Sequence, residues 1–254
     1  MNVSKECKER LLRAAKKIMA SKHLVIFTGA GISTESGIPD YRGPQGVWTL
    51  KAQGKKPKQT VSWDKVKPNT GHYAIVDLQN MGLMKFLISQ NVDGLHLASG
   101  IRPELIAEFH GNRTLMRCLS CDRQFPKKGL WDEKKWSKGY RTQPVVPGQP
   151  VCPRCGSRII SSVVNFGDPI PEKELKLSIS HSRKADVFVA VGSSLTVTPA
   201  ADMPVNAKAN DAFLIIINKM QTGLDRFADI RFFEGAGFVL SGIVSIIKKL
   251  HDVT

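Results

Sequence analysis

Short runs of apolar residues, each ending in small or polar residues, recur along the chain. They cover residues 23–27, 86–88, 187–191 and 213–217. Runs that are apolar at nearly every position are typical of strands buried on both faces of a parallel sheet. Segments with helical spacing lie between or beside them, at about 5–20, 71–81, 171–183, 199–209 and 237–250. This alternation predicts an α/β fold with a Rossmann-like doubly wound parallel sheet.

Polar residues follow each apolar run, and they indicate where a ligand would bind. The runs end at Gly29-Ala30-Gly31, Ser89-Gln90-Asn91, Gly192-Ser193-Ser194 and Asn218-Lys219. In a doubly wound sheet, ligands bind beyond the carboxyl ends of the strands. We therefore expect all four strand ends to border one crevice.

The turn after the first strand has part of a dinucleotide-binding pattern. Gly29 allows a tight turn, and Gly31 lets backbone N–H groups approach a pyrophosphate at a helix start. Thr34 occupies the position of the usual third glycine, and no acid follows a second strand about twenty residues later. A plain dehydrogenase is therefore disfavoured, and the turn alone leaves nucleotide binding and a purely structural role equally open.

Four cysteines form two pairs with the spacing of metal ligands, Cys118-x-x-Cys121 and Cys152-x-x-Cys155. Two such pairs complete a tetrahedral Zn²⁺ site with no open position, which predicts a structural metal. Two disulfides or four unrelated core thiols are the alternatives, but only Cys7 lies outside the pairs and no secretory signal is apparent. We expect a small zinc-binding module at 114–161, inserted into a Rossmann-like domain made of 1–113 and 162–254.

The chain has 37 basic and 22 acidic residues, a formal net charge of +15. A basic surface attracts anionic partners such as nucleic acid, although a solvated lysine-rich face is the simpler explanation. No apolar run is long enough to cross a membrane, and residues 1–22 lack the apolar core of a signal peptide, so an intracellular, cytoplasmic protein is the default expectation. Six lysines cluster in one stretch: Lys51, Lys55, Lys56, Lys58, Lys65 and Lys67.

Several further motifs change how the glycine turn is interpreted. They are Pro39-Asp40-Tyr41-Arg42-Gly43, Ser89 to His96, Phe109-His110-Gly111-Asn112 and Gly192-Ser193-Ser194-Leu195, together with the four cysteines. In this order and spacing, along residues 24–250, they resemble the sirtuins, the NAD-dependent protein lysine deacylases. The segment Pro44 to Thr49 is most similar to the class IV branch, which includes nuclear chromatin sirtuins. The resemblance therefore makes a nuclear location an alternative to the cytoplasmic one expected by default.

The resemblance implies that NAD⁺ is a substrate rather than a hydride carrier. Nicotinamide leaves, the acyl oxygen of a modified lysine attacks the ribose C1′, and a histidine acts as general base on the ribose hydroxyls. The products are free lysine and O-acyl-ADP-ribose. By motif match the base is His110, with Asn91 and Asp93 ordering the nicotinamide end and the ribose. Imidazole suits this role because its pKa lies close to working pH. The alternative for His110 is a core or capping histidine, and the alternative for Asn91 and Asp93 is a turn at the end of a strand.

The same match predicts which residues contact NAD. Tyr41 departs from the family, where the position is commonly Phe, and Ser193 is a conservative change. Arg42 offers its guanidinium to phosphate, with a surface ion pair as the alternative. The predicted cofactor-binding residues are Gly29, Ala30, Gly31, Thr34, Asp40, Tyr41, Arg42, Trp48, Gln90, Asn91, Gly192, Ser193, Ser194, Asn218 and Ala236.

The segment Val163 to Asp168 resembles the family segment that binds an acyl-lysine peptide as an added strand. Main-chain hydrogen bonds of that kind read an extended peptide with little sequence preference. The predicted substrate-binding residues are Val164, Asn165, Phe166 and Gly167, and an ordinary internal strand is the alternative. The other histidines, His23, His72, His96, His181 and His251, are expected to be structural.

Two other functions remain open beside lysine deacylation. One is mono-ADP-ribosyl transfer at the same site, in which a protein nucleophile intercepts the ribosyl cation. The other is a zinc-bearing nucleic-acid or chromatin binder that keeps an NAD pocket. The oligomeric state and the preferred acyl chain are left open by the sequence.

Overall fold

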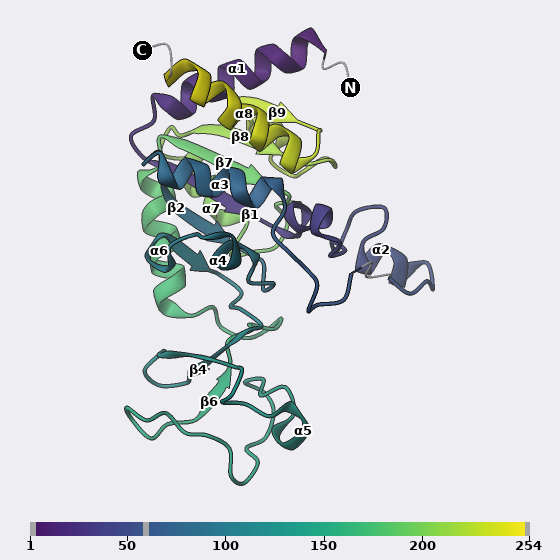
Figure 1. Cartoon of the computed structure of the whole chain (residues 1–254), viewed down its shortest axis with the longest axis vertical. Helices are drawn as coiled ribbons and strands as arrows, with labels where there is room; N and C mark the ends of the chain where they lie inside the picture. The colour runs from purple at the N-terminus through teal and green to yellow at the C-terminus, as the bar shows by residue number, and fades with distance from the viewer. Residues whose placement is uncertain (1–3, 58–60, 252–254) are drawn as a thin grey trace.

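The computed structural model describes residues 4–57 and 61–251, and its centre is a six-stranded parallel sheet (Figure 1). The two central strands are buried at every position, in agreement with their uninterrupted apolar runs. This confirms the predicted Rossmann-like parallel sheet. In spatial order the strands are β3 (Ile106–Glu108), β2 (Met84–Ser89), β1 (Leu24–Thr28), β7 (Val187–Val191), β8 (Phe213–Ile217) and β9 (Ile230–Phe232).

Helices cover both faces of this sheet. One hydrophobic core joins a sheet face to the buried sides of three helices, and a second core fills the opposite face. The first face is covered by α1 (Lys5–Met19), α3 (Thr70–Asn80) and α8 (Ala236–His251), and the second by α6 (Glu172–Lys184) and α7 (Asp202–Lys208). Two three-residue strands, β3 and β9, were not expected from the sequence.

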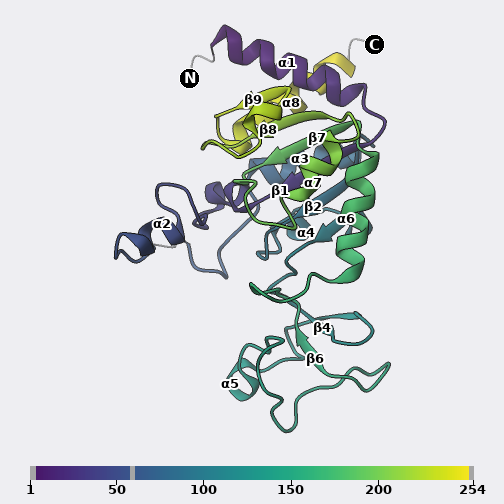
Figure 2. The ribbon, with the colours of Figure 1, turned by 180° about the vertical axis from the view of Figure 1, so that it is seen from behind.

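A second, smaller sheet lies apart from the first, at the far end of the molecule (Figures 1 and 2). It is antiparallel and has its own small core, to which Trp131 contributes. Its one helix among the described residues is a single turn. The boundaries 114 and 161 of this module stay a prediction. Its elements are β4 (Leu115–Cys118), β5 (Gln124–Pro126), α5 (Glu133–Trp136) and β6 (Ile159–Ser161).

Residues 37–57 and 61–69, which precede α3, form an arm that projects from the body and carries one short helix (Figures 1 and 2). The helix start expected after β1 is instead a 3₁₀ turn, which Gly37 ends in a left-handed conformation with φ +85°. Lys58 lies outside the described residues. The remaining elements are η1 (Ala30–Ser36), α2 (Val47–Ala52), α4 (Leu95–Ser99), η2 (Pro103–Leu105) and η3 (Asp225–Phe227).

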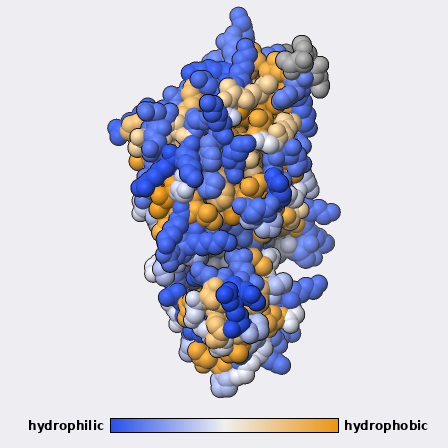
Figure 3. All heavy atoms as spheres, turned by 90° about the vertical axis from the view of Figure 1, so that its left-hand side faces the viewer, coloured by the Kyte–Doolittle hydropathy of each residue, from blue (hydrophilic) through white to orange (hydrophobic). Residues whose placement is uncertain are grey.

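The face over α6, seen in Figure 3, is mainly hydrophilic, with apolar residues in small scattered groups. Among the described helices, none combines the length and the apolar character that crossing a membrane requires.

Candidate active site

A cavity of about 900 Å³ opens at the carboxyl ends of the parallel strands, and a hollow of about 360 Å³ adjoins it. The two share Gly31, Asp40, Gly192 and Asn218. Thr34 and Ala236 line the smaller hollow. The larger cavity is lined by the remaining residues that were predicted to be catalytic, NAD-binding or peptide-binding: Gly29, Ala30, Gly31, Asp40, Tyr41, Arg42, Trp48, Gln90, Asn91, Asp93, His110, Val164, Asn165, Phe166, Gly167, Gly192, Ser193, Ser194 and Asn218.

The floor of the cavity is a close crossing of two backbones, and only glycine fits there. A Cβ on Gly31 would lie 2.6 Å from the Cα of Gly192, and the N–H of Gly31 donates to the Gly192 carbonyl at 2.8 Å. Gly192 has φ +62°, and a Cβ on it would lie 2.4 Å from the nitrogen of Ile32. The absence of side chains at these two positions lets a pyrophosphate approach the backbone closely.

His110 lies in a tight turn directly after β3. Its Nδ1 is 3.0 Å from the carbonyl oxygen of Gln90, which can only accept, so Nδ1 carries the proton. Nε2 is then the unprotonated nitrogen that can accept a proton. Burial lowers the pKa of His110, and the bond to Gln90 offsets part of that effect. The side chain is therefore neutral near pH 7 and available as a base.

Asn91 and Asp93 are joined by a serine that the sequence did not single out. The Ser33 hydroxyl donates to Asp93 Oδ2 at 2.7 Å and accepts from Asn91 Nδ2 at 3.2 Å. The N–H of Leu95 donates to the other Asp93 oxygen at 2.9 Å. Burial raises the pKa of Asp93, and the hydrogen bonds from Leu95 and Ser33 oppose that shift. The three side chains form one buried polar network beside His110.

The arm supplies an aromatic wall to the cavity. The rings of Tyr41 and Trp48 are 5.1 Å apart, and those of Trp48 and Phe166 are 5.7 Å apart. Arg42 stacks on Trp48 at 4.3 Å rather than forming an ion pair within the described residues. Phe166 is 80% exposed although it is a large apolar residue. Such a surface is suited to cover an apolar group that enters the cavity.

The substrate segment is not an internal strand, so that alternative interpretation is wrong. Residues 163–167 belong to neither sheet, and one main-chain bond anchors them, from the N–H of Val164 to the carbonyl of His110 at 2.9 Å. Asp168 caps the turn that follows by accepting from the N–H of Asn165 at 3.1 Å. The segment connects β6 to α6 and is paired with no strand of either sheet.

Sequence reasoning overlooked several residues that line the cavity. Ser33 lies within the motif around the glycine turn, but nothing in its spacing indicated a bond to Asp93, sixty residues away. Trp63 lines the cavity from the end of the arm. Val163 and the stretch 196–199 also line it, without a sequence signal that we can identify.

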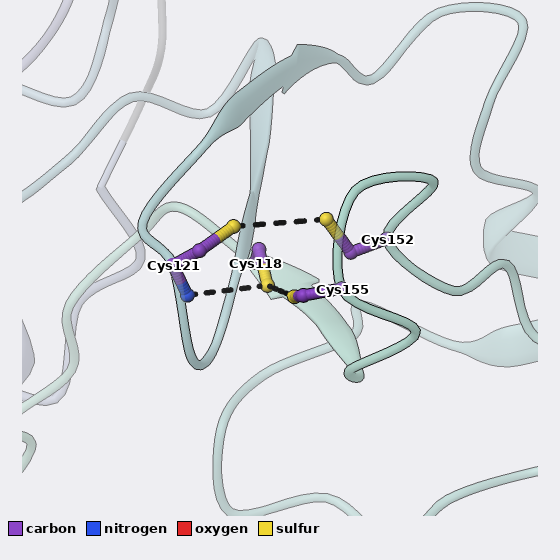
Figure 4. A group of neighbouring side chains, drawn as sticks. All are labelled: Cys118, Cys121, Cys152 and Cys155. Atoms are coloured by element: carbon purple, nitrogen blue, oxygen red, sulfur yellow. Dashed lines mark hydrogen bonds between the residues drawn. The ribbon is translucent and has the colours of Figure 1, made fainter.

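The four cysteines meet in the small module, as the spacing predicted (Figure 4). Their sulfurs all lie within 4.8 Å of one another. The separations between Cys118 and Cys155, 3.5 Å, and between Cys121 and Cys152, 3.7 Å, are too long for disulfides. Sulfurs bound tetrahedrally at about 2.3 Å from Zn²⁺ lie about 3.8 Å apart, so the cluster fits this ion. Two ligands come from the β4 knuckle and two from the loop before β6.

The family model that matches this chain is described as the Sir2 family, and it covers residues 53–199. The NAD-dependent protein deacetylase SRT1 of Arabidopsis thaliana is 38% identical over 92% of this chain and 48% of its own length. The NAD-dependent protein deacetylase of Thermodesulfovibrio yellowstonii is also 38% identical, over 95% of this chain and 96% of its own. The chain thus spans about half of the plant relative and nearly all of the bacterial one.

A solved structure shows the same architecture. Sir2Af2, bound to a myristoylated histone peptide, superposes with a TM-score of 0.68 at 34% identity, over 97% of this chain and 100% of the other. The agreement covers both sheets, because it extends over nearly the whole chain.

Proposed function

This chain belongs to the Sir2 family, and on that premise we propose that it is an NAD-dependent protein lysine deacylase. The proposal is carried by one observation: His110, with Nδ1 held by the Gln90 carbonyl, shares a cavity with the Ser33–Asn91–Asp93 network and the glycine crossing. The products would be nicotinamide, free lysine and O-acyl-ADP-ribose.

Different residues of the cavity would bind different parts of NAD. Gly31 and Gly192 leave room for the pyrophosphate against backbone, and Gln90 orients Ser193 by donating to its hydroxyl at 2.9 Å. At the other end Asn218 and Ala236 border the smaller hollow, where the adenosine would lie. When bound, NAD supplies an electrophilic ribose carbon as nicotinamide departs.

His110 then serves as general base. With Nδ1 committed to Gln90, Nε2 takes the proton from a ribose hydroxyl, and the same nitrogen can return it later. Asn91 and Asp93 are held by Ser33 so that an amide and a carboxylate face the ribose and nicotinamide end. The wall of Tyr41 and Trp48 excludes water from the reacting carbon.

The acyl-lysine peptide would lie along residues 164–167, which are open to main-chain pairing. Relatives with deacetylase in their names and the myristoylated peptide bound to Sir2Af2 support acyl-lysine as the substrate class. Acceptance of long acyl chains and membership of the class IV branch are the finer parts of this proposal. The cysteine cluster offers no open coordination position, so zinc would hold the module together and take no part in the reaction.

Two further parts of the proposal concern partners and place. The net charge of +15 supports contact with nucleic acid or chromatin, which salt-dependent binding would reveal. An intracellular location, cytoplasmic or nuclear, is proposed from the free cysteines and the family.

Mass spectrometry of reactions with NAD⁺ and either an acetyl-lysine or a myristoyl-lysine peptide tests the function. We expect O-acyl-ADP-ribose from at least one peptide, and none from His110→Ala. The variant should still bind ADP-ribose, which separates lost chemistry from lost folding. ADP-ribose mass on protein without O-acyl-ADP-ribose would instead establish ADP-ribosyl transfer.

A further inference from the structure

The arm between η1 and α3 carries an exposed set of lysines that the proposed chemistry does not use. None of them forms an ion pair within the described residues, and the ammonium group of Lys55 donates to the uncharged amide oxygen of Gln53. One acid, Asp64, lies among them. The charge of the arm is therefore largely uncompensated. The exposed lysines are Lys51, Lys55, Lys56, Lys65 and Lys67.

The same arm forms part of the cavity wall, so these lysines are carried by an element that borders the cavity. Trp48 and Trp63 both line the cavity, and Lys51 follows Trp48 on the same short helix, α2. Trp48 contacts Phe166 of the substrate segment, with the ring centroids 5.7 Å apart. A peptide on residues 164–167 would leave the cleft beside α2.

The other side of this opening is also basic. Trp63 at the end of the arm stacks against Arg113, whose guanidinium carbon is 3.8 Å from the ring centroid. Burial lowers the pKa of Arg113, and the carboxylates of Glu133 on α5 and of Asp93 in the active site oppose that shift. Both ribbon views show α5 and the arm on the same side of the molecule (Figures 1 and 2).

The basic residues of α5 outnumber its acid. The Glu133 carboxylate is shared by Lys127 and Lys138, so its charge is already neutralised. Lys134 and Lys135 are exposed and have no ion pair within the described residues. Lysines without an ion pair among the described residues are thus carried by two separate elements on this side of the molecule. We call this set, the five arm lysines with Lys134 and Lys135, the basic rim.

We propose that the basic rim selects acyl-lysine peptides whose flanking residues are acidic. This inference rests on the proposed function and adds a substrate class to it. Main-chain pairing along residues 164–167 depends little on the side chains of the peptide. The charge of the residues that flank the acyl-lysine can therefore contribute more to the choice among peptides. Lysine ammonium groups attract carboxylates without a fixed geometry, whereas the residues 47–67 contain no arginine for bidentate phosphate contacts. This favours an acidic peptide over nucleic acid as the occupant.

Three acetyl-lysine peptides with one shared core and acidic, neutral or basic flanks test the proposal. We measure kcat and KM for each, and their affinity for His110→Ala by fluorescence anisotropy, at about 0.05 M and 0.5 M salt. We expect KM to be about tenfold lower for the acidic than for the basic peptide at low salt, with similar kcat, since charge at a rim acts on association. The difference should shrink at high salt, because the Debye length falls well below 10 Å.

Charge reversal on the arm, Lys51→Glu/Lys55→Glu/Lys56→Glu, should remove or invert this preference. The matched control, Lys5→Glu/Lys8→Glu/Lys16→Glu, changes the net charge equally on α1, which lies apart from the arm at the end of the molecule away from the small module (Figure 1). The control should keep the preference for acidic flanks. Thermal melts of both variants report whether each is folded.

Several results would overturn the inference. Equal KM for the three peptides, a preference for basic flanks, or equal effects of the arm and control variants would each do so. An arm variant that loses affinity for a DNA duplex but keeps the peptide preference would assign the lysines to nucleic acid instead. Turnover of no peptide with NAD⁺ would count against the deacylase function itself, while anisotropy would still report on the rim.

Discussion

The amide nitrogen Nδ2 of Asn112 donates to Oε1 of Glu108 at 2.7 Å, across the turn that carries His110. Both side chains are buried, and the Asn112 oxygen accepts from the N–H and the hydroxyl of Thr114. Gly111 within the turn has φ +77°, and a Cβ there would lie 1.8 Å from the Ser162 carbonyl oxygen. The position of the His110 ring thus depends on a side-chain bridge as well as on backbone geometry.

Removing this bridge should slow turnover without weakening NAD binding. Asn112→Ala leaves the buried Glu108 carboxylate without its partner, which costs roughly 1–3 kcal/mol of stability. We expect kcat to fall about tenfold or more, because His110 loses its fixed position, and ADP-ribose affinity to stay within about twofold. Calorimetry and steady-state kinetics measure the two effects.

A buried amide far from the cavity provides the control for that variant. Gln79 accepts from the N–H of Arg102 at 2.8 Å and is 3% exposed. Gln79→Ala should lower the melting temperature in a similar way but leave kcat of the folded enzyme unchanged. Equal kcat losses in the two variants would show that Asn112 has no particular role in positioning His110.

Glu108 should make the protein less stable as pH rises through neutrality. Burial raises the pKa of the Glu108 carboxyl to about 7. The hydrogen bond from Asn112 opposes this shift, and the charges of Glu174 and Asp93 add to it. Since the folded pKa exceeds the ordinary value of 4.5, the folded state favours the protonated form. That stabilisation is fully present below about pH 4.5 and is lost as pH rises to about 7.

Glu108→Gln keeps an acceptor for Asn112 but does not titrate. Relative to the variant, the wild type should therefore lose up to roughly 3 kcal/mol of unfolding free energy between pH 5 and pH 8. Urea unfolding at several pH values measures this. Parallel stability curves for the two proteins would show that Glu108 titrates normally in the folded state.

The pH dependence of turnover should report the environment of His110. Burial lowers its pKa below the ordinary 6.5, and the base is active only when it is neutral. We expect kcat/KM to fall in acid with a midpoint below pH 6.5. A midpoint above 6.5 would mean that the imidazolium is stabilised in the active enzyme, contrary to the buried geometry.

The sheet was predictable because strands buried on both faces are continuous apolar runs, such as Val187–Val191. The strands β3 and β9 escaped because each has three residues, one of them charged: Glu108 and Arg231. Motifs indicated the residues around the cavity, but not the bonds that join them. Ser33 and Asp93 are sixty residues apart and carry no shared pattern, so the folded chain alone shows their contact.

Zinc should be required for the small module and not for the large domain. Cys121→Ala leaves three thiolates, and we expect the zinc content to fall from one per chain and the module to lose its packing. Trp131 and Trp136, whose rings are 5.4 Å apart in that core, give a near-UV circular dichroism signal for it. Cys7→Ala is the control, because Cys7 lies on α1 in the core of the large domain and not in the small module.

ADP-ribose binding distinguishes a structural from a catalytic zinc. The glycine crossing lies in the large sheet, so the Cys121→Ala variant should keep measurable ADP-ribose affinity even where the module signal is lost. A variant with normal zinc content, or a metal-free variant with normal turnover, would contradict the structural role.

A pair of histidines outside the cavity lining, His23 and His181, should make the fold sensitive to acid. His23 Nε2 and His181 Nδ1 are 3.0 Å apart, and His181 stacks on Phe86 with ring centroids 3.9 Å apart. Burial lowers the pKa of His181 to about 4, with His23 and Lys184 adding to the effect. Burial and Lys184 also lower the pKa of His23, with Asp186 opposing.

Because the folded pKa values are depressed, the neutral pair contributes stability above about pH 6.5, and this is lost as pH falls toward 4. In His181→Gln only His23 of the pair still titrates, so the melting temperature of the variant should fall less between pH 7 and pH 5 than that of the wild type. His251→Gln, at the exposed end of α8, should behave like the wild type. If His181→Gln shows the same acid shift as the wild type, the acid sensitivity arises from other groups.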